Sequence, residues 1–78
     1  MLEKMIMLDN LGSVRDFADI AGQKDYLIEL SSGGKRVNGN SIEEIFTLDL
    51  TKPIKMTAHC EMVAEISRQI EQYIINNK

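Results

Sequence analysis

In several short segments of the chain, apolar residues either alternate with polar residues or form an uninterrupted run. Residues 5–8 form an apolar run, and residues 26–30 and 54–58 alternate, which is typical of strands buried on at least one face. The stretch 31–34, Ser-Ser-Gly-Gly, has the composition of a turn. It predicts a hairpin whose second arm is a short strand at 35–38.

A helical period governs the segment between the first two predicted strands. Four apolar residues recur there at helical spacing: Val14, Phe17, Ala18 and Ala21. Ser13 and Asp16 have the spacing of a capping box, and Gly22 is a common stop signal. The pattern predicts a helix over residues 13–22.

Two more helices are predicted in the second half of the chain. Ser41 and Glu44 form a second capping box, so a short amphipathic helix is expected to begin there and to end before Pro53. An apolar stripe over about four turns predicts a longer C-terminal helix. The members of this stripe are Val63, Ile66, Ile70, Tyr73 and Ile74. Glu61 near its start and Lys78 near its end suit the helix dipole.

The predicted elements follow the order β-α-β-β-α-β-α. Four strands and three helices from 78 residues cannot cover both faces of a sheet. The economical arrangement is an α+β fold, a two-layer open-faced sandwich with helices on one face of an antiparallel sheet and solvent on the other. Because the chain contains no linker or repeat, we expect one domain spanning residues 1–78.

Charge and composition narrow the classes of partner. Nine basic and twelve acidic residues give a net charge of −3, which argues against nucleic acid or a membrane surface as the main partner. No apolar stretch approaches the ~20 residues that cross a bilayer, and the segment 1–8 is too short and too charged for a signal peptide. The single cysteine, Cys60, excludes an intrachain disulfide. We expect a cytoplasmic location.

The sequence carries no motif for a cofactor or a metal. It lacks a cluster of histidines and cysteines, and it lacks a glycine-rich phosphate loop. The acidic residues are scattered over helical faces, and the five methionines fit core and edge packing. We therefore expect no metal, no cofactor and no enzymatic activity.

Residues 34–42, Gly-Lys-Arg-Val-Asn-Gly-Asn-Ser-Ile, and residues 45–50, Ile-Phe-Thr-Leu-Asp-Leu, carry a family resemblance. Together with the element order, they resemble the stretch of HPr, the small phosphocarrier of bacterial sugar uptake, that closes the hairpin and opens the second helix. The resemblance implies an HPr-like fold with strand order 1-4-2-3 and three helices on one face. It also places Ser41 at the family's regulatory serine.

The family's motif at the start of the first helix, Gly-Leu-His-Ala-Arg-Pro-Ala, is altered in this chain. The corresponding segment has Ser13 at the histidine, Arg15 at the arginine and Asp16 at the proline. Histidine phosphotransfer needs an imidazole nucleophile at a helix N-terminus. A serine phosphate is too stable to be passed onward, so the change predicts that the relay is absent.

The only histidine, His59, follows the fourth predicted strand. In an antiparallel sheet of order 1-4-2-3, that strand runs opposite to the first. We therefore expect His59 to lie about one strand length, ~17 Å, from the start of the first helix. At that distance the imidazole has no catalytic role there.

Two roles are open for Ser41. The resemblance implies phosphorylation by an HPr-type kinase, and a helix N-terminus favours a phosphate. A plain N-cap, worth about 1 kcal/mol to the helix, is the simpler role. Glu43 and Glu44 oppose phosphorylation because their carboxylates add like charge beside the phosphate.

Three further features each have a functional and a structural interpretation. Arg15 either binds an anion at the first helix or is a solvated helix residue. Ile42, Ile45 and Phe46 either form a docking patch, as in the family, or pack against the sheet. Cys60 either has a thiol activated by a helix N-terminus or is a small, half-buried residue.

Three functions remain open. The resemblance without the histidine favours a regulatory or protein-binding module related to the sugar phosphotransferase system. Its partners would be proteins, such as an HPr-type kinase or a transcriptional regulator. The alternatives are a phosphocarrier of the phosphoenolpyruvate-dependent system and a stand-alone interaction domain unrelated to sugar transport.

Overall fold

The elements of the chain form one antiparallel sheet with helices packed against it. The computed structural model describes residues 1–75. Its elements are, in chain order, β1 (Leu2–Ile6), α1 (Leu11–Gly22), β2 (Ile28–Ser32), β3 (Lys35–Asn38), α2 (Ile42–Ile45), β4 (Ile54–Ala58), α3 (Ala64–Gln69) and the 3-10 turn η1 (Glu71–Tyr73). The strands lie in the spatial order β1-β4-β2-β3, and each neighbouring pair is antiparallel. The predicted element order and strand order are confirmed.

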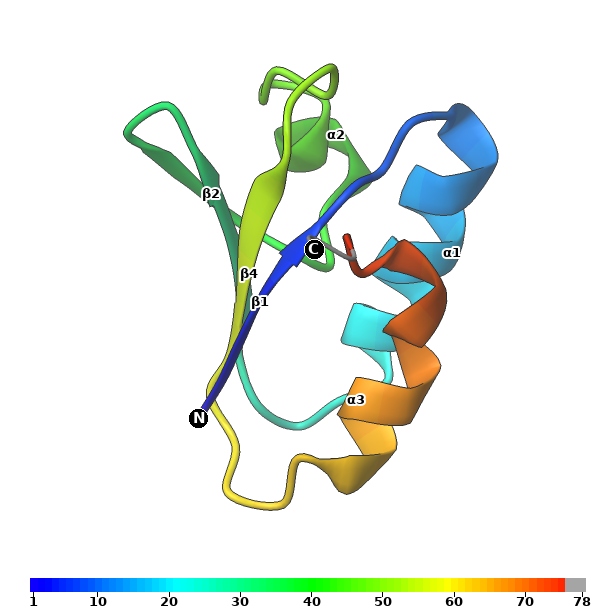
Figure 1. The fold of residues 1–78 in the computed structure, drawn as a ribbon, viewed down its shortest axis with the longest axis vertical. Coiled ribbons are helices and arrows are strands. Elements are labelled where there is room, and N and C mark those ends of the chain that lie inside the picture. Colours follow the sequence, from blue (N-terminus) through cyan, green and yellow to red (C-terminus); the bar gives the residue numbers. More distant parts are fainter. Residues whose placement is uncertain (76–78) are drawn as a thin grey trace.

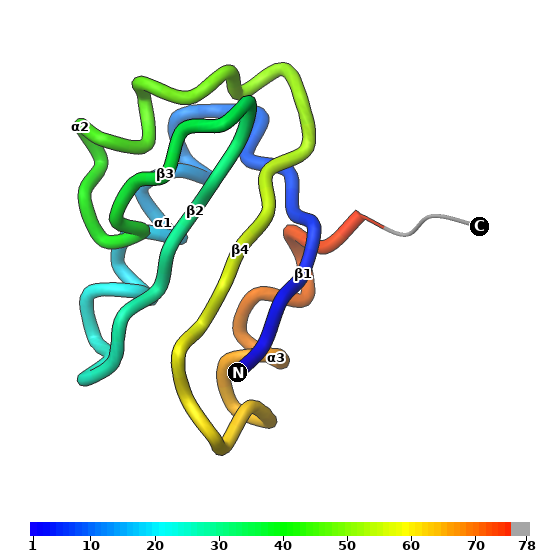
Figure 2. The backbone as a smooth tube through the Cα atoms, turned by 90° about the vertical axis from the view of Figure 1, so that its left-hand side faces the viewer, coloured from blue at the N-terminus to red at the C-terminus, as the bar shows by residue number. Residues whose placement is uncertain are grey.

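The helices cover one face of the sheet and leave the other face open. Figure 1 shows α1 and α3 side by side against the same face, with α2 near one end of the strands. Figure 2 looks onto the opposite face, where the strands lie in front and no helix covers them. The architecture is therefore the predicted α+β open-faced sandwich.

Alternation along the strands separates the two faces. In β4, Ile54, Met56 and Ala58 are fully buried toward the helices, while Lys55 and Thr57 lie on the open face. The other strands add Ile6, Ile28, Leu30 and Val37 to the core. The helices and their connections add Leu8, Val14, Phe17, Ala18, Ala21, Ile45, Leu48, Ile66, Ile70 and Tyr73.

The first two strands lie two to three residues away from their predicted positions. β1 begins at Leu2, not at residue 5, because its ladder with β4 pairs Leu2 with Ala58 and continues to Ile6. The charged residues at its start are compatible with a strand because Glu3 projects onto the open face and pairs with Lys55.

The hairpin between β2 and β3 is tighter than predicted. β2 extends to Ser32, and its ladder includes the pair Ser32–Lys35. Only Gly33 and Gly34 remain for the turn, with φ of 57° and 82°. A two-residue hairpin turn with both φ values positive matches the twist of the strands and favours glycine, so both serines stay in the strand.

The C-terminal helix is shorter than the predicted four turns. α3 ends at Gln69 and is followed by η1, although the predicted stripe still buries Ile66, Ile70 and Tyr73. After η1 the chain runs along β1, where the Ile75 N–H donates to the Met5 carbonyl at 3.0 Å. This pairing requires extended backbone, which ends the helix early. The predicted charge at Lys78 lies outside the described residues.

Candidate functional site

The amino end of α1 is formed by Asn10, not by Ser13. The Asn10 side-chain oxygen accepts the Ser13 N–H at 2.8 Å, and the Asn10 carbonyl accepts the Val14 N–H at 3.1 Å. The prediction that Ser13 and Asp16 cap this helix is therefore wrong. Asparagine is among the best N-caps, and its position three residues before Ser13 places Ser13 inside the first turn.

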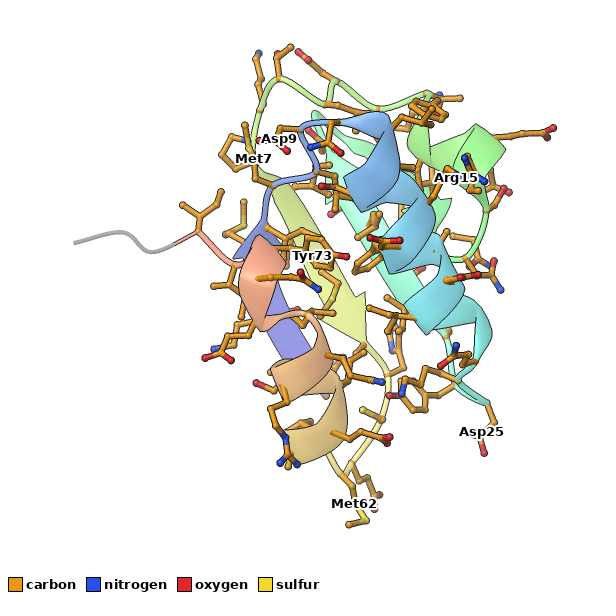
Figure 3. The ribbon with its side chains drawn as sticks, turned by 90° about the vertical axis from the view of Figure 1, so that its right-hand side faces the viewer. Met7, Asp9, Arg15, Asp25, Met62 and Tyr73 are labelled. Carbon is orange, nitrogen blue, oxygen red and sulfur yellow. The ribbon has the colours of Figure 1, made fainter. Side chains whose placement is uncertain are left out.

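The surroundings of this helix start carry negative as well as positive charge. The Asn10 amide group also donates to the Asp9 carboxylate at 3.2 Å. Figure 3 shows Asp9 and Arg15 at the end of the molecule where α1 begins. An exposed carboxylate this close to the free N–H groups of the helix disfavours a second anion there.

His59 lies at the opposite end of the sheet from the start of α1. It follows β4, whose last residue, Ala58, pairs with Leu2 at the beginning of β1. α1 follows the other end of β1, about 17 Å away along a five-residue strand. The His59 ring is 2.9 Å from the Glu29 carboxylate, on the open face. The structure does not bring His59 and Arg15 together.

Arg15 lies in a groove between α1 and α2. The groove has a volume of about 380 Å³, and its lining consists of Gly12, Arg15, Asp16, Asp19 and Ile42. Arg15 is exposed and makes no ion pair within residues 1–75. Two carboxylates in the same groove offset its charge, so the groove as a whole does not favour an anion.

Asp16 also acts electrostatically on Tyr73, whose side chain is buried. Burial raises the pKa of the Tyr73 phenol, and the Asp16 carboxylate raises it further. The Tyr73 hydroxyl has no hydrogen-bond partner among the described residues. Tyr73 packs edge-on against Phe17, with ring centroids 5.9 Å apart, so its role is in the core.

Ser41 is the N-cap of α2, a helix of a single turn. Its hydroxyl oxygen accepts the Glu44 N–H at 3.3 Å. The predicted reciprocal bond is absent, because the Glu44 carboxylate accepts the N–H of Asn38 at 3.0 Å instead. The Ser41 N–H donates to the Asn38 carbonyl at 3.3 Å. Ser41 and Glu44 thus tie the end of β3 to the start of α2.

The predicted docking residues of α2 separate into exposed and buried positions. Ile42 and Phe46 are 38% and 47% exposed, whereas Ile45 is fully buried in the core. Ile45 therefore does not belong to an exposed patch. The four-residue spacing of Ile42 and Phe46 places both on one side of the turn.

Leu11 is a third exposed apolar residue, and it lies outside the helix predicted over residues 13–22. It is 55% exposed and lies in the first turn of α1. The groove that contains Gly12 and Ile42 brings this turn next to α2. Recognising Asn10 as the N-cap would have identified Leu11 as a helix residue.

Cys60 is half-buried and lies in the segment before α3, not at the N-terminus of that helix. The N-cap of α3 is Val63, three residues later, so the helix terminus does not reach the thiol. The Cys60 thiol donates to the Met62 carbonyl at 3.7 Å. Burial raises the pKa of Tyr26 to about 12, and the nearby Cys60 contributes to a smaller extent.

The described part of the chain holds no cluster of metal-binding side chains. No group of three or more histidine, cysteine, aspartate or glutamate residues converges anywhere in residues 1–75. Over the same residues, the helices are too short and too polar to span a lipid bilayer.

Structural comparison identifies the architecture. The crystal structure of HPr-C-His from Thermoanaerobacter tengcongensis matches with a TM-score of 0.77 and 22% sequence identity, over 95% of this chain and 91% of that chain. The chain has an HPr-like fold. Comparison with models of protein families gives no match, and neither does comparison with curated protein sequences. At this identity the HPr likeness establishes the fold, and function must be argued from the residues.

Proposed function

We propose that the chain is a protein-binding module, related to the sugar phosphotransferase system, that acts by contact and not by histidine phosphotransfer. The observation that carries this proposal is a set of exposed apolar side chains on two elements in contact, Leu11 on α1 and Ile42 and Phe46 on α2. We call it the α1–α2 surface. It lies at the end of the molecule where an HPr-like fold presents its first helix, and His59 lies at the other end.

The residues at the start of α1 support the loss of the relay. Asn10 and Ser13 offer an amide and a hydroxyl where phosphotransfer needs an imidazole. The Asn10 side chain is already engaged as the helix cap, and Asp9 adds negative charge beside it. Neither group forms a labile phosphate that could be handed to another protein.

The α1–α2 surface has the composition of a contact site. Its three apolar side chains are each more than a third exposed, although apolar residues of this size are usually buried. Charged groups border it: Arg15, Asp16 and Asp19 share its groove. An apolar centre with a charged rim is typical of transient protein interfaces. The partner would bring an apolar side chain for the centre and at least one cation for the aspartates.

The direct test is binding to purified candidate partners, an HPr-type kinase and the transcriptional regulator of the same system. We expect Phe46→Ala to weaken the binding about tenfold, because central aromatic residues often contribute 1–2 kcal/mol or more to an interface, roughly a factor of ten per 1.4 kcal/mol. Met62→Ala is the matched control. Met62 is 87% exposed, and Figure 3 shows it at the far end of the molecule.

Titration calorimetry of both variants against each partner distinguishes the outcomes. Equal weakening of binding by the two substitutions would show that the α1–α2 surface is not the binding site. Absence of binding to either partner would favour a stand-alone interaction domain unrelated to sugar transport.

The phosphocarrier alternative has the fold comparison in its favour. It predicts that the general phosphotransferase enzyme and labelled phosphoenolpyruvate place an acid-labile label on the chain. We expect no label above that of a His59→Gln control. A label that His59→Gln abolishes would overturn the proposal.

Modification of Ser41 is a finer part of the proposal. Within residues 1–75 its hydroxyl makes a single long hydrogen bond, to the Glu44 N–H at 3.3 Å, so little is lost when the oxygen is esterified. A phosphate there would add charge next to Ile42 and so alter the α1–α2 surface. Incubation with an HPr-type kinase and ATP, followed by mass spectrometry, tests this step. Ser41→Ala is the control. If the wild-type chain stays unmodified, the proposal that Ser41 is phosphorylated is rejected.

A further inference from the structure

The open face of the sheet carries a row of residues contributed by all four strands. Across the ladder, Met5 pairs with Lys55, Lys55 with Ser31, and Ser31 with Arg36. Ser31 therefore has a cation on each side. Directly paired residues on one face of a sheet have Cβ atoms about 5 Å apart. The side chains of Lys55, Ser31 and Arg36 can therefore reach one ligand together.

This row opens into a groove at the hairpin end of the face. The groove has a volume of about 460 Å³. Its lining combines three cations, two serine hydroxyls, the glycine turn and two apolar residues: Lys35, Arg36, Lys55, Ser31, Ser32, Gly33, Gly34, Met5 and Pro53. No aspartate or glutamate among residues 1–75 is part of it. The glycines have no side chains, which leaves the end of the groove open.

The cations of this groove are largely free to bind a ligand. Within the described residues, Lys35 and Arg36 have no carboxylate within ion-pair distance, and Lys55 reaches Glu3 at 3.5 Å. Both members of the Lys55–Glu3 pair are about half exposed, so the pair is weak.

Two other grooves of the molecule that contain cations also contain carboxylates. The groove near Arg15 also contains Asp16 and Asp19. The groove that contains Lys4 and Arg68, beside α3, includes Glu71. The hairpin groove therefore concentrates positive charge on a chain whose net charge is −3.

We propose that the hairpin groove binds the phosphate group of a small phosphorylated molecule. The Arg36 guanidinium donates two parallel hydrogen bonds to phosphate oxygens, and Lys35 and Lys55 supply further charge. The Ser31 hydroxyl donates from between the cations. Three cations match the charge of a diphosphate or a phosphate ester better than that of a single carboxylate. The volume is sufficient for such a molecule, since small-ligand sites are usually about 300–1,000 Å³.

This site is independent of the proposed function. It lies on the face of the sheet that Figure 2 shows uncovered, whereas the α1–α2 surface lies on the helical side. Either proposal can fail without affecting the other.

The test is a titration with inorganic pyrophosphate at constant ionic strength, followed by amide chemical shifts in two-dimensional NMR spectra. We expect saturable shifts of the amides of residues 31–36 and of Lys55. Arg36→Gln should weaken binding about tenfold, because it removes a charge and the two parallel hydrogen bonds of the guanidinium. Arg68→Gln makes the same chemical change on α3 and should leave the affinity unchanged.

A variant with the opposite sign sharpens the test. Glu3 competes with the ligand for Lys55, so Glu3→Gln should tighten pyrophosphate binding by about twofold to fivefold, the range expected for an exposed ion pair. Equal weakening by Arg36→Gln and Arg68→Gln would mean that only overall charge matters and would overturn the site. Unsaturable shifts, or shifts confined to other residues, would also overturn it.

Discussion

The two faces of the sheet differ in what they contribute, although the same strands build both. On β4, Met56 is fully buried beneath the helices, whereas its neighbour Thr57 lies on the open face. The buried residues of the covered face are apolar, whereas the open face carries Glu3, Lys55 and Arg36. Because apolar burial is the main favourable term in folding, the covered face supplies the stability. The open face is consequently free to carry charge that serves binding.

The largest expected effect comes from the covered face of β4. Met56→Ala should lower the free energy of unfolding by about 2–5 kcal/mol, because it removes a fully buried side chain and leaves a cavity. Urea denaturation followed by circular dichroism measures this change. If the variant is too unstable to study, Ile54→Val should cost about 0.5–1.5 kcal/mol.

The matched control for this prediction is Thr57→Ala on the other face of the same strand. We expect a loss below about 1 kcal/mol, because β propensity changes and almost no apolar burial is lost. Similar losses for Met56→Ala and Thr57→Ala would contradict the division of labour between the two faces.

The next largest effect concerns the helix that covers the sheet. Asn10→Ala should destabilise the protein by about 0.5–2 kcal/mol, since the Ser13 N–H loses its cap. Asn40→Ala is a suitable control, because within residues 1–75 the Asn40 side chain makes no hydrogen bond. Thermal unfolding of the two variants compares them. A smaller loss for Asn10→Ala than for Asn40→Ala would show that α1 does not depend on this cap.

The strand and helix periods in the sequence predicted the architecture but not all element ends. The strand at residues 54–58 and the strand at 35–38 were placed correctly, because alternation marks the face that meets the helices. The start of β1 was missed because residues 2–4 include two charges and become a strand only through pairing with β4. The C-terminal helix was predicted too long because its end is set by pairing with β1. Both errors come from contacts between segments far apart in the sequence.

The candidate sites depend on distant contacts to a still greater degree. Local sequence identified Arg15, Ile42 and Phe46, which the structure brings to one end of the molecule. It could not identify the hairpin groove, because nothing in the sequence pairs Lys55 with Ser31. Strand register decides which residues are neighbours, and register is a property of the whole sheet.

Alkaline pH should lower the free energy of unfolding of the domain. The pKa of Tyr26 is raised from 10.0 to about 12, mainly by burial, so the folded chain keeps the phenol proton that the unfolded chain loses first. Between these two pH values the folded state binds more protons than the unfolded state, and stability therefore falls as the pH rises. The Tyr73 pKa, also raised by burial, acts in the same direction.

The difference between wild type and Tyr26→Phe isolates this contribution. Urea midpoints should be compared at about pH 8 and about pH 11, on either side of the ordinary tyrosine pKa. We expect the wild type to lose more stability than Tyr26→Phe over this interval. Parallel losses would show that other groups, such as lysines, account for the alkaline weakening.

The smallest effect is expected on the open face itself. Glu3 and Lys55 form an ion pair at 3.5 Å in which both side chains are about half exposed. A double-mutant cycle with Glu3→Gln and Lys55→Gln should give a coupling free energy below about 0.5 kcal/mol, because solvent screens the pair and ordering two long side chains costs entropy. A coupling above about 2 kcal/mol would mean that this face also stabilises the fold. A small coupling leaves Lys55 available to a bound phosphate at little cost to the folded state.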